Sequence, residues 1–294
     1  MNILENIKQT FRQGDSLTRL IFINISVFVI LSLIEVFLRL FNISGSFIWS
    51  IFAVPAQLKQ LLYHFWTLIS YMFLHEYFWH LLFNMLSLFW FGKLFLIYFS
   101  EKQLVGLYLL GGLLGALFFI ASFNLFPYYS DIKSNSYVLG ASASVMSIIL
   151  ATAIKSPNME MQLLLLGGVK LKYIASFAVL SSAFGITRGN DGGQLAHLGG
   201  ALAGYLFVVS LRQGKDITSG LTQLLNAISD LLKPRRLKVR PNKYRQNSRM
   251  SDAEYNSNKA KKMAKIDEIL DKIKTSGYDS LSTDEKKRLF EKTK

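Results

Sequence analysis

Long apolar stretches, separated by short polar connections, occupy the first two thirds of the chain. A transmembrane helix needs about 20 apolar residues to cross roughly 30 Å of hydrocarbon. The stretches therefore predict six membrane spans, at residues 20–41, 78–99, 104–123, 138–154, within 161–186, and 195–211. The fourth span is short, and glycines and lysines interrupt the first part of the fifth. We expect that first part to lie at the membrane interface.

Residues 42–77 connect the first two spans and are rich in apolar side chains. Pro55, Lys59 and His64 interrupt this connection, so no part of it is long enough to cross a membrane. We therefore expect an interfacial or re-entrant loop that its aromatic side chains hold in place. Within the first span, Glu35 and Arg39 are one helical turn apart and can form an ion pair.

The composition agrees with a membrane protein. Of the 294 residues, 51% are hydrophobic, and the mean hydropathy of +0.30 is too high for a long soluble chain. The sequence contains no cysteine, which excludes disulfides and thiolate metal sites. It also contains no His-Glu-x-x-His pattern and no glycine-rich phosphate loop. We therefore expect no metal site.

Charge is distributed unevenly along the chain. Residues 1–211 contain 12 Lys and Arg against 8 Asp and Glu, whereas residues 212–294 contain 21 against 11. Lys and Arg next to membrane spans favour the cytoplasmic side. Applied to the six predicted spans, this bias places both termini in the cytoplasm. The second, fourth and sixth spans then all run inward from the outer side.

Ser142 and His197 lie at the beginnings of the fourth and sixth predicted spans, so this topology puts them at a similar depth. Ionisable groups inside a membrane are costly and often functional. A serine beside a histidine is the minimal nucleophile and base of a hydrolase. Two plainer interpretations remain open: Gly140-Ala141-Ser142 is also typical of helix packing, and His197 can serve packing or a proton relay. No carboxylate lies at the same depth, which favours a dyad over a triad.

His80 and Asn84 are four residues apart, on one face of the second span. Two such polar side chains, together with the Ser142 backbone N–H, can donate hydrogen bonds to an oxyanion. His75 lies just outside the span, and we expect it to order the loop through hydrogen bonds. Gly200 and Gly204 form a Gly-x-x-x-Gly motif that lets the sixth span approach a neighbour closely.

The chain closely resembles the rhomboid intramembrane serine proteases in three motifs, which occur in order on the second, fourth and sixth spans. These motifs are His75-x-x-x-x-His80-x-x-x-Asn84, Gly140-Ala141-Ser142, and Ala196-His197-x-Gly199-Gly200-x-x-x-Gly204. The resemblance covers about residues 15–211. It implies an all-α polytopic bundle of six transmembrane helices with a basic C-terminal tail. It also implies a location in the cell membrane, most simply a bacterial inner membrane.

The resemblance further implies a serine-type endopeptidase that cleaves in or near transmembrane segments of other membrane proteins, without a cofactor. Ser142 would be the nucleophile and His197 the base, while His80, Asn84 and the Ser142 N–H would form the oxyanion hole. The alternative is a catalytically silent rhomboid-like protein that binds membrane proteins as an adaptor. A binder has no reason to keep both Ser142 and His197, which favours the protease. A transporter is disfavoured because the sequence has no visible inverted repeat.

Two residues near Ser142 depart from the pattern of the family. Ala143 stands where glycine is usual, and Met146 stands where an aromatic ring usually stacks on the base. A thioether can still pack against an imidazole. Gly140, Gly200 and Gly204 keep the pattern and are expected to support the site by close packing.

We divide the chain into a cytoplasmic N-terminal segment (1–19), a rhomboid membrane domain (20–211), a basic juxtamembrane linker (212–260) and a small helical element (261–294). The basic residues of the linker favour binding to anionic lipid, at about 1 kcal/mol for each residue near the surface. Leucines and isoleucines within 221–232 have helical spacing, which predicts an amphipathic interfacial helix. Nucleic-acid binding is disfavoured because no known module is present. The last element resembles one that ends some bacterial rhomboids.

Overall fold

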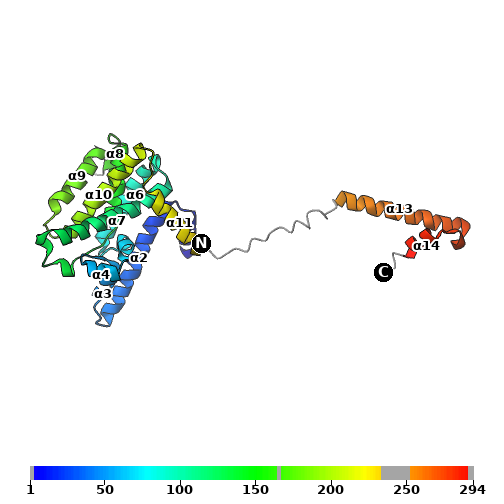
Figure 1. Ribbon diagram of the computed structural model, residues 1–294, viewed down its shortest axis with the longest axis horizontal. Coiled ribbons are helices and arrows are strands. Elements are labelled where there is room, and N and C mark those ends of the chain that lie inside the picture. The colour runs from blue at the N-terminus through cyan, green and yellow to red at the C-terminus, as the bar shows by residue number, and fades with distance from the viewer. Residues whose placement is uncertain (1–2, 164–166, 233–251, 291–294) are drawn as a thin grey trace. The chain divides into compact units, whose positions relative to one another are not determined.

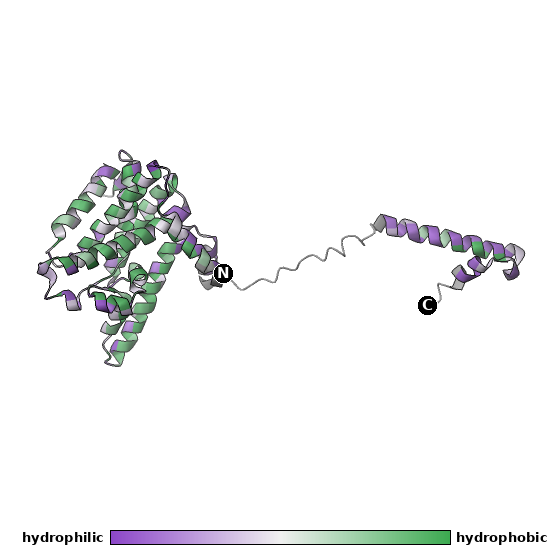
Figure 2. Cartoon of the chain, in the orientation of Figure 1, coloured by the Kyte–Doolittle hydropathy of each residue, from purple (hydrophilic) through white to green (hydrophobic). Residues whose placement is uncertain are grey.

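The computed structural model describes residues 3–163, 167–232 and 252–290. The chain divides into two compact units, Met1–Lys233 and Pro234–Lys294, and each is described by itself (Figure 1). The helices of the first unit are mostly hydrophobic, whereas α13 in the second is mostly hydrophilic (Figure 2). This contrast separates a membrane domain from a polar C-terminal unit.

The first unit is a mostly helical bundle with two short strand pairs, and its helical architecture agrees with the prediction. Its main helices are α2 (Ser16–Leu40), α6 (Phe78–Tyr98), α7 (Glu101–Leu125), α8 (Ser142–Lys155), α9 (Leu171–Gly185) and α10 (Asp191–Arg212). Among the described residues, α2, α6, α7 and α10 are long and apolar enough to cross a membrane, whereas α8 and α9 are shorter apolar helices of 14 and 15 residues. The fourth and fifth predicted spans are therefore real helices that fall below the usual spanning length.

The starts of these two short helices differ from the prediction. Residues Tyr137–Val138 form β2, which pairs with β1 (Val54–Pro55), and α8 begins only at Ser142. Gly140 has a φ of +124°, which a helix cannot contain. Before α9, the strands β3 (Glu160–Leu163) and β4 (Gly167–Lys170) form an antiparallel hairpin. The predicted interfacial part of the fifth span is thus a hairpin.

The connection between α2 and α6 is a series of short helices. These are α3 (Ser46–Phe52), α4 (Leu58–Tyr63), α5 (Thr67–Ser70) and the 3-10 helix η1 (Tyr71–Phe73). Two tyrosine hydroxyls fix its end to the bundle: Tyr71 donates to the Gly112 carbonyl at 2.6 Å, and Tyr108 donates to the Met72 carbonyl at 2.8 Å. Large apolar side chains of α4 and its surroundings remain exposed, which suits a segment in contact with lipid.

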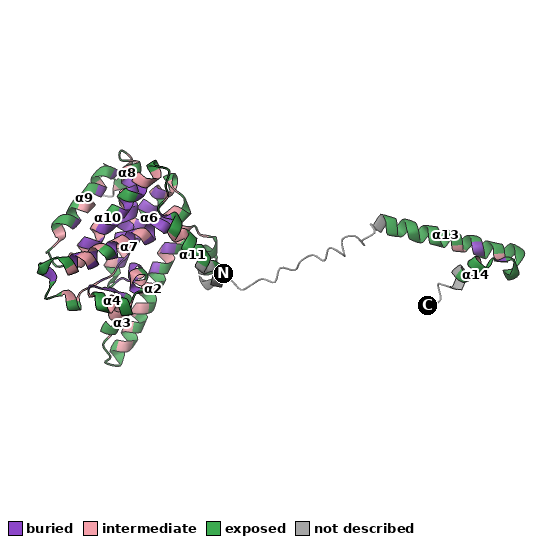
Figure 3. Cartoon of the chain, in the orientation of Figure 1, coloured by how far each residue is buried: buried purple, intermediate pink, exposed green. Residues whose placement is uncertain are grey.

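Helix α10 packs closely against α7 and α8 because glycines line its buried face. A Cβ on Gly199 would collide with the Leu114 carbonyl of α7, and one on Gly200 would collide with the Ala143 carbonyl of α8. A Cβ on Gly204 would likewise collide with the Ser147 carbonyl of α8. The buried residues gather around these helices (Figure 3). Close backbone approach through small residues is the usual basis of helix association in lipid.

Polar contacts join the start of α7 to the start of α2 and to the segment before α11. The backbone N–H and hydroxyl of Ser16 on α2 both donate to the Glu101 carboxylate on α7, at 2.8 and 2.7 Å. Gln103, also on α7, donates to Asp216 at 3.0 Å, just before α11 (Ser219–Leu232). An amphipathic helix precedes α2, namely α1 (Ile3–Gln13). The 3-10 turns η2 (Pro127–Tyr129) and η3 (Lys133–Asn135) follow α7.

The second unit contains α13 (Asp252–Ser276), the 3-10 turn η4 (Tyr278–Ser280) and α14 (Thr283–Phe290). Lys272 and Glu285 form a salt bridge of 3.1 Å between the two helices. Gly277 turns the chain with a φ of +78°. The first of these helices has 25 residues and begins at Asp252, nine residues before the start of the helical element expected at 261–294.

Candidate active site

Ser142 is the first residue of α8, and the turn before it depends on Gly140. A Cβ on Gly140 would lie only 2.9 Å from the Cε1 and Nε2 atoms of His80, and 3.6 Å from the Ser142 hydroxyl. Only glycine therefore permits both the positive φ and the approach of His80. As the first residue of a helix, Ser142 also has a backbone N–H without an intrahelical partner.

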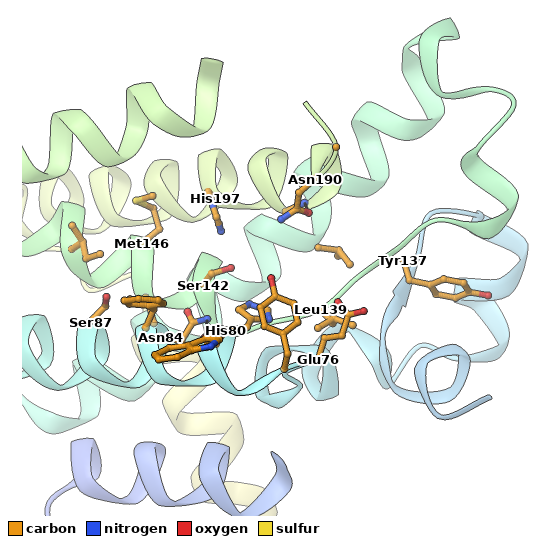
Figure 4. Close-up of a pocket in the computed structure, with 18 residues that line it drawn as sticks. Glu76, His80, Asn84, Ser87, Tyr137, Leu139, Ser142, Met146, Asn190 and His197 are labelled. Atoms are coloured by element: carbon orange, nitrogen blue, oxygen red, sulfur yellow. Dashed lines mark hydrogen bonds between the residues drawn. The ribbon is translucent and has the colours of Figure 1, made fainter. Parts of the chain in front are cut away.

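His197 lies on α10 and lines the same cavity as Ser142. Its imidazole points toward the Ser142 side chain in Figure 4. Contact of Gly200 with the backbone of Ala143 brings the two helices together at this level. Within the described residues no hydrogen bond joins Ser142 to His197, and such bonds are often long in enzymes without substrate.

The other ring nitrogen of His197 has a partner that the sequence did not reveal. The Ser182 hydroxyl on α9 lies 3.1 Å from His197 Nδ1, and Ser182 is buried. The sequence contains two adjacent serines on this helix, Ser181 and Ser182, and only the second faces the bundle. The sequence did not reveal this partner because the usual partner of a catalytic histidine is a carboxylate, whereas the partner here is a serine hydroxyl.

His80 and Asn84 both line the cavity from one face of α6, as their spacing predicts. Asn84 Nδ2 donates to the His80 backbone carbonyl at 2.9 Å, which uses one of its two N–H groups. The second N–H is available to a ligand in the cavity. In Figure 4 both side chains lie on the same side of the cavity as the start of α8.

His75 lies in the loop before α6, and its side chain is buried. Neither ring nitrogen meets full hydrogen-bond geometry with a described residue, but the Phe73 backbone is close enough to favour the protonated ring. Its ring packs edge-on against His80, with a centroid distance of 5.0 Å. Burial, and next the proximity of His80, lower the pKa of His75 to about 3, so this imidazole is neutral at physiological pH. Because packing against His80 needs no hydrogen bond, the sequence pattern did not reveal it.

The cavity that contains these residues has a volume of about 770 Å³. Polar groups line the end near Ser142, and Phe83, Met146 and Ile149 line an apolar part. Met146, the thioether that stands in place of the usual aromatic ring, lines the same cavity as His197 (Figure 4). Among the described residues, no group of three or more His, Cys, Asp or Glu is arranged to hold a metal ion.

The fold and the cavity define a polytopic helical membrane protein with a polar site enclosed by its own helices. In comparison with known families, residues 63–214 match the Rhomboid domain, and this range is about half of the chain. The chain therefore belongs to the rhomboid family, as its motifs predicted.

One curated relative is RHOMBOID-like protein 12, mitochondrial, of Arabidopsis thaliana, with 28% identity over 158 residues. The similar region covers 51% of this chain and 47% of that protein, so the chain spans about half the length of this relative. Residues 251–294 match a family of unknown function (DUF6576). This match covers the second unit as the structure describes it, from α13 onward.

Proposed function

We propose that this protein is an intramembrane serine endopeptidase that hydrolyses peptide bonds in or near transmembrane segments of other proteins. The observation that carries the proposal is one cavity in which Ser142 and His197, from two closely packed helices, face His80 and Asn84. Membership of the rhomboid family supports it. A cavity that served only helix packing would have no need of four polar side chains.

In the proposed reaction, His197 accepts the proton of the Ser142 hydroxyl as its oxygen attacks the substrate carbonyl carbon. The negative charge that develops on the carbonyl oxygen is stabilised by His80, Asn84 and the Ser142 N–H. His197 then donates its proton to the leaving amine as the peptide bond breaks. A water molecule, deprotonated by His197, hydrolyses the acyl-enzyme and regenerates the serine. No cofactor takes part in these steps.

We further infer a multi-pass protein of the cell membrane, in a bacterial inner membrane, with both termini in the cytoplasm. The starts of α6, α8 and α10 all line the cavity, so the site would open toward the outer side. Substrates would be single transmembrane segments entering from the bilayer. Anionic lipid would bind the basic linker, although its residues 233–251 lie outside the described residues.

The proposal is tested by cleavage of a reporter transmembrane substrate by purified full-length protein in detergent. We expect cleavage by the wild type, loss of cleavage in Ser142→Ala and His197→Ala, and no loss in Ser144→Ala. Ser144 is a suitable control because it lies two residues away on the same helix, buried among other residues and outside the cavity lining. Cleavage that persists in Ser142→Ala would overturn the nucleophile. No cleavage by folded wild type on several substrates would support a silent binder instead.

A further inference from the structure

Helix α9 has a single polar side chain on its buried face. Most of its large apolar side chains are exposed, and only Leu171, Ala175 and Ser182 are buried. A buried hydroxyl without a partner costs free energy, so its position here requires a hydrogen bond. The hydrogen-bond partner of the Ser182 hydroxyl is Nδ1 of His197, at 3.1 Å. Of the side-chain hydrogen bonds among described residues, this one alone joins α9 to another helix.

We propose that Ser182 is a positioning residue that holds the His197 imidazole in the orientation and tautomer that its role as a base requires. This inference rests on the proposed function. When Nδ1–H donates to the Ser182 oxygen, the lone pair of the imidazole is on Nε2. That nitrogen is then free to accept the proton of Ser142. Without an acceptor at Nδ1, the proton can occupy either nitrogen and the ring can rotate.

The proposed bond becomes stronger during the reaction. Once His197 has accepted the proton of Ser142, both ring nitrogens carry hydrogen, and Nδ1–H needs an acceptor. A hydroxyl oxygen supplies one, in the place that a carboxylate takes in a Ser-His-Asp triad. Hydrogen bonds to charged groups are stronger than those between neutral groups. Ser182 therefore favours the state that forms after proton transfer over the resting state.

The position of Ser182 also explains why a carboxylate is absent from this place. Nδ1 of His197 faces Ser182 on the buried face of α9, where the other buried side chains are Leu171 and Ala175. A carboxylate on this face would have to be buried without a cation, at a high desolvation cost. A hydroxyl can accept the same hydrogen bond at a much smaller cost.

The test compares Ser182→Ala with Ser181→Ala in the full-length protein. Ser181 is a matched control because it is the neighbouring residue on α9 and is exposed. For Ser182→Ala we expect kcat on the reporter substrate to fall about tenfold or more, with KM unchanged, because a hydrogen bond to a charged group is lost. Ser181→Ala should match the wild type. Equal kcat in Ser182→Ala and wild type would overturn the inference.

A second measurement reports on the imidazole itself and does not depend on cleavage. The chain contains four histidines, so ¹⁵N NMR of histidine-labelled protein can resolve His197, identified by its loss in His197→Gln. We expect protonated Nδ1 and unprotonated Nε2 in the wild type, and a mixture of tautomers in Ser182→Ala. The same tautomer in both would overturn the inference. If no form cleaves any substrate, the proposed function fails, and this spectrum alone decides whether Ser182 positions His197.

Discussion

Gly200→Ala should move the proposed nucleophile, Ser142, away from the proposed base, His197, without altering either side chain. A Cβ at Gly200 would lie 2.8 Å from the Ala143 carbonyl carbon and 3.0 Å from its Cα, whereas ordinary contact begins at 3.4 Å. These neighbours are backbone atoms of α8 and cannot turn away, so the two helices must move apart by roughly half an ångström or more. Ala143 directly follows Ser142, and Gly200 is one turn after His197. The displacement is therefore transmitted to the catalytic pair.

A misplacement of about 1 Å can cost about 100-fold in rate, so we expect Gly200→Ala to lose between about 10- and 100-fold in kcat/KM. Overpacking should also lower the free energy of unfolding by about 1–3 kcal/mol. The assay is cleavage of the reporter substrate, with thermal unfolding measured in parallel. Gly220→Ala is the control, because a Cβ there meets nothing within 4 Å. Full activity and an unchanged unfolding temperature in Gly200→Ala would refute the packing argument.

Three further substitutions test other parts of the site and its frame. Gly140→Ala combines a strained positive φ with a collision against His80, so cleavage should fall by more than about tenfold; cleavage kinetics at wild-type level would contradict this. Asn84→Ala removes a proposed oxyanion donor and should lower kcat by about 100-fold or more, while a change confined to KM would point to substrate binding instead. Burial alone would raise the pKa of Asp216, but hydrogen bonds from Thr218 and Gln103 outweigh it and hold the pKa below its usual value. The stabilisation by Asp216 is therefore present above its unfolded pKa of about 3.9 and is lost as pH falls through the lower folded pKa. Unfolding temperatures of wild type and Asp216→Asn should converge as pH falls from about 7 to about 3, and a constant difference would contradict this reasoning.

The sequence predicted the six main helices of the membrane domain, because each lies in an apolar stretch, but α8 and α9 begin later than expected. It also indicated the juxtaposition of Ser142, His197, His80 and Asn84, since the topology places the starts of three helices at one end. The ion pair of Glu35 and Arg39, at 2.6 Å, is confirmed as well.

Other features depend on tertiary contacts that one-dimensional patterns do not contain. The pairing of β3 with β4 lies within an apolar stretch that we expected to be part of a span, and a short apolar run alone does not distinguish a strand from a helix. Ser182 was missed because its burial depends on the rotation of α9 about its own axis.

At Gly200 and Gly204, α10 contacts α8 directly through backbone atoms, with glycine on one side and the backbone of Ala143, Ser147 and Ala151 on the other. Glycine has no side chain and therefore loses no rotamer entropy when the two helices pack. It also offers no alternative rotamer through which the spacing can relax. A change in bilayer thickness or temperature therefore cannot alter the distance between the helices at this contact through a change of side-chain rotamer. The influence of such a change on the cavity would come through α9 and the connections at the helix ends, so the separation of α8 and α10 is the least adjustable dimension of the cavity.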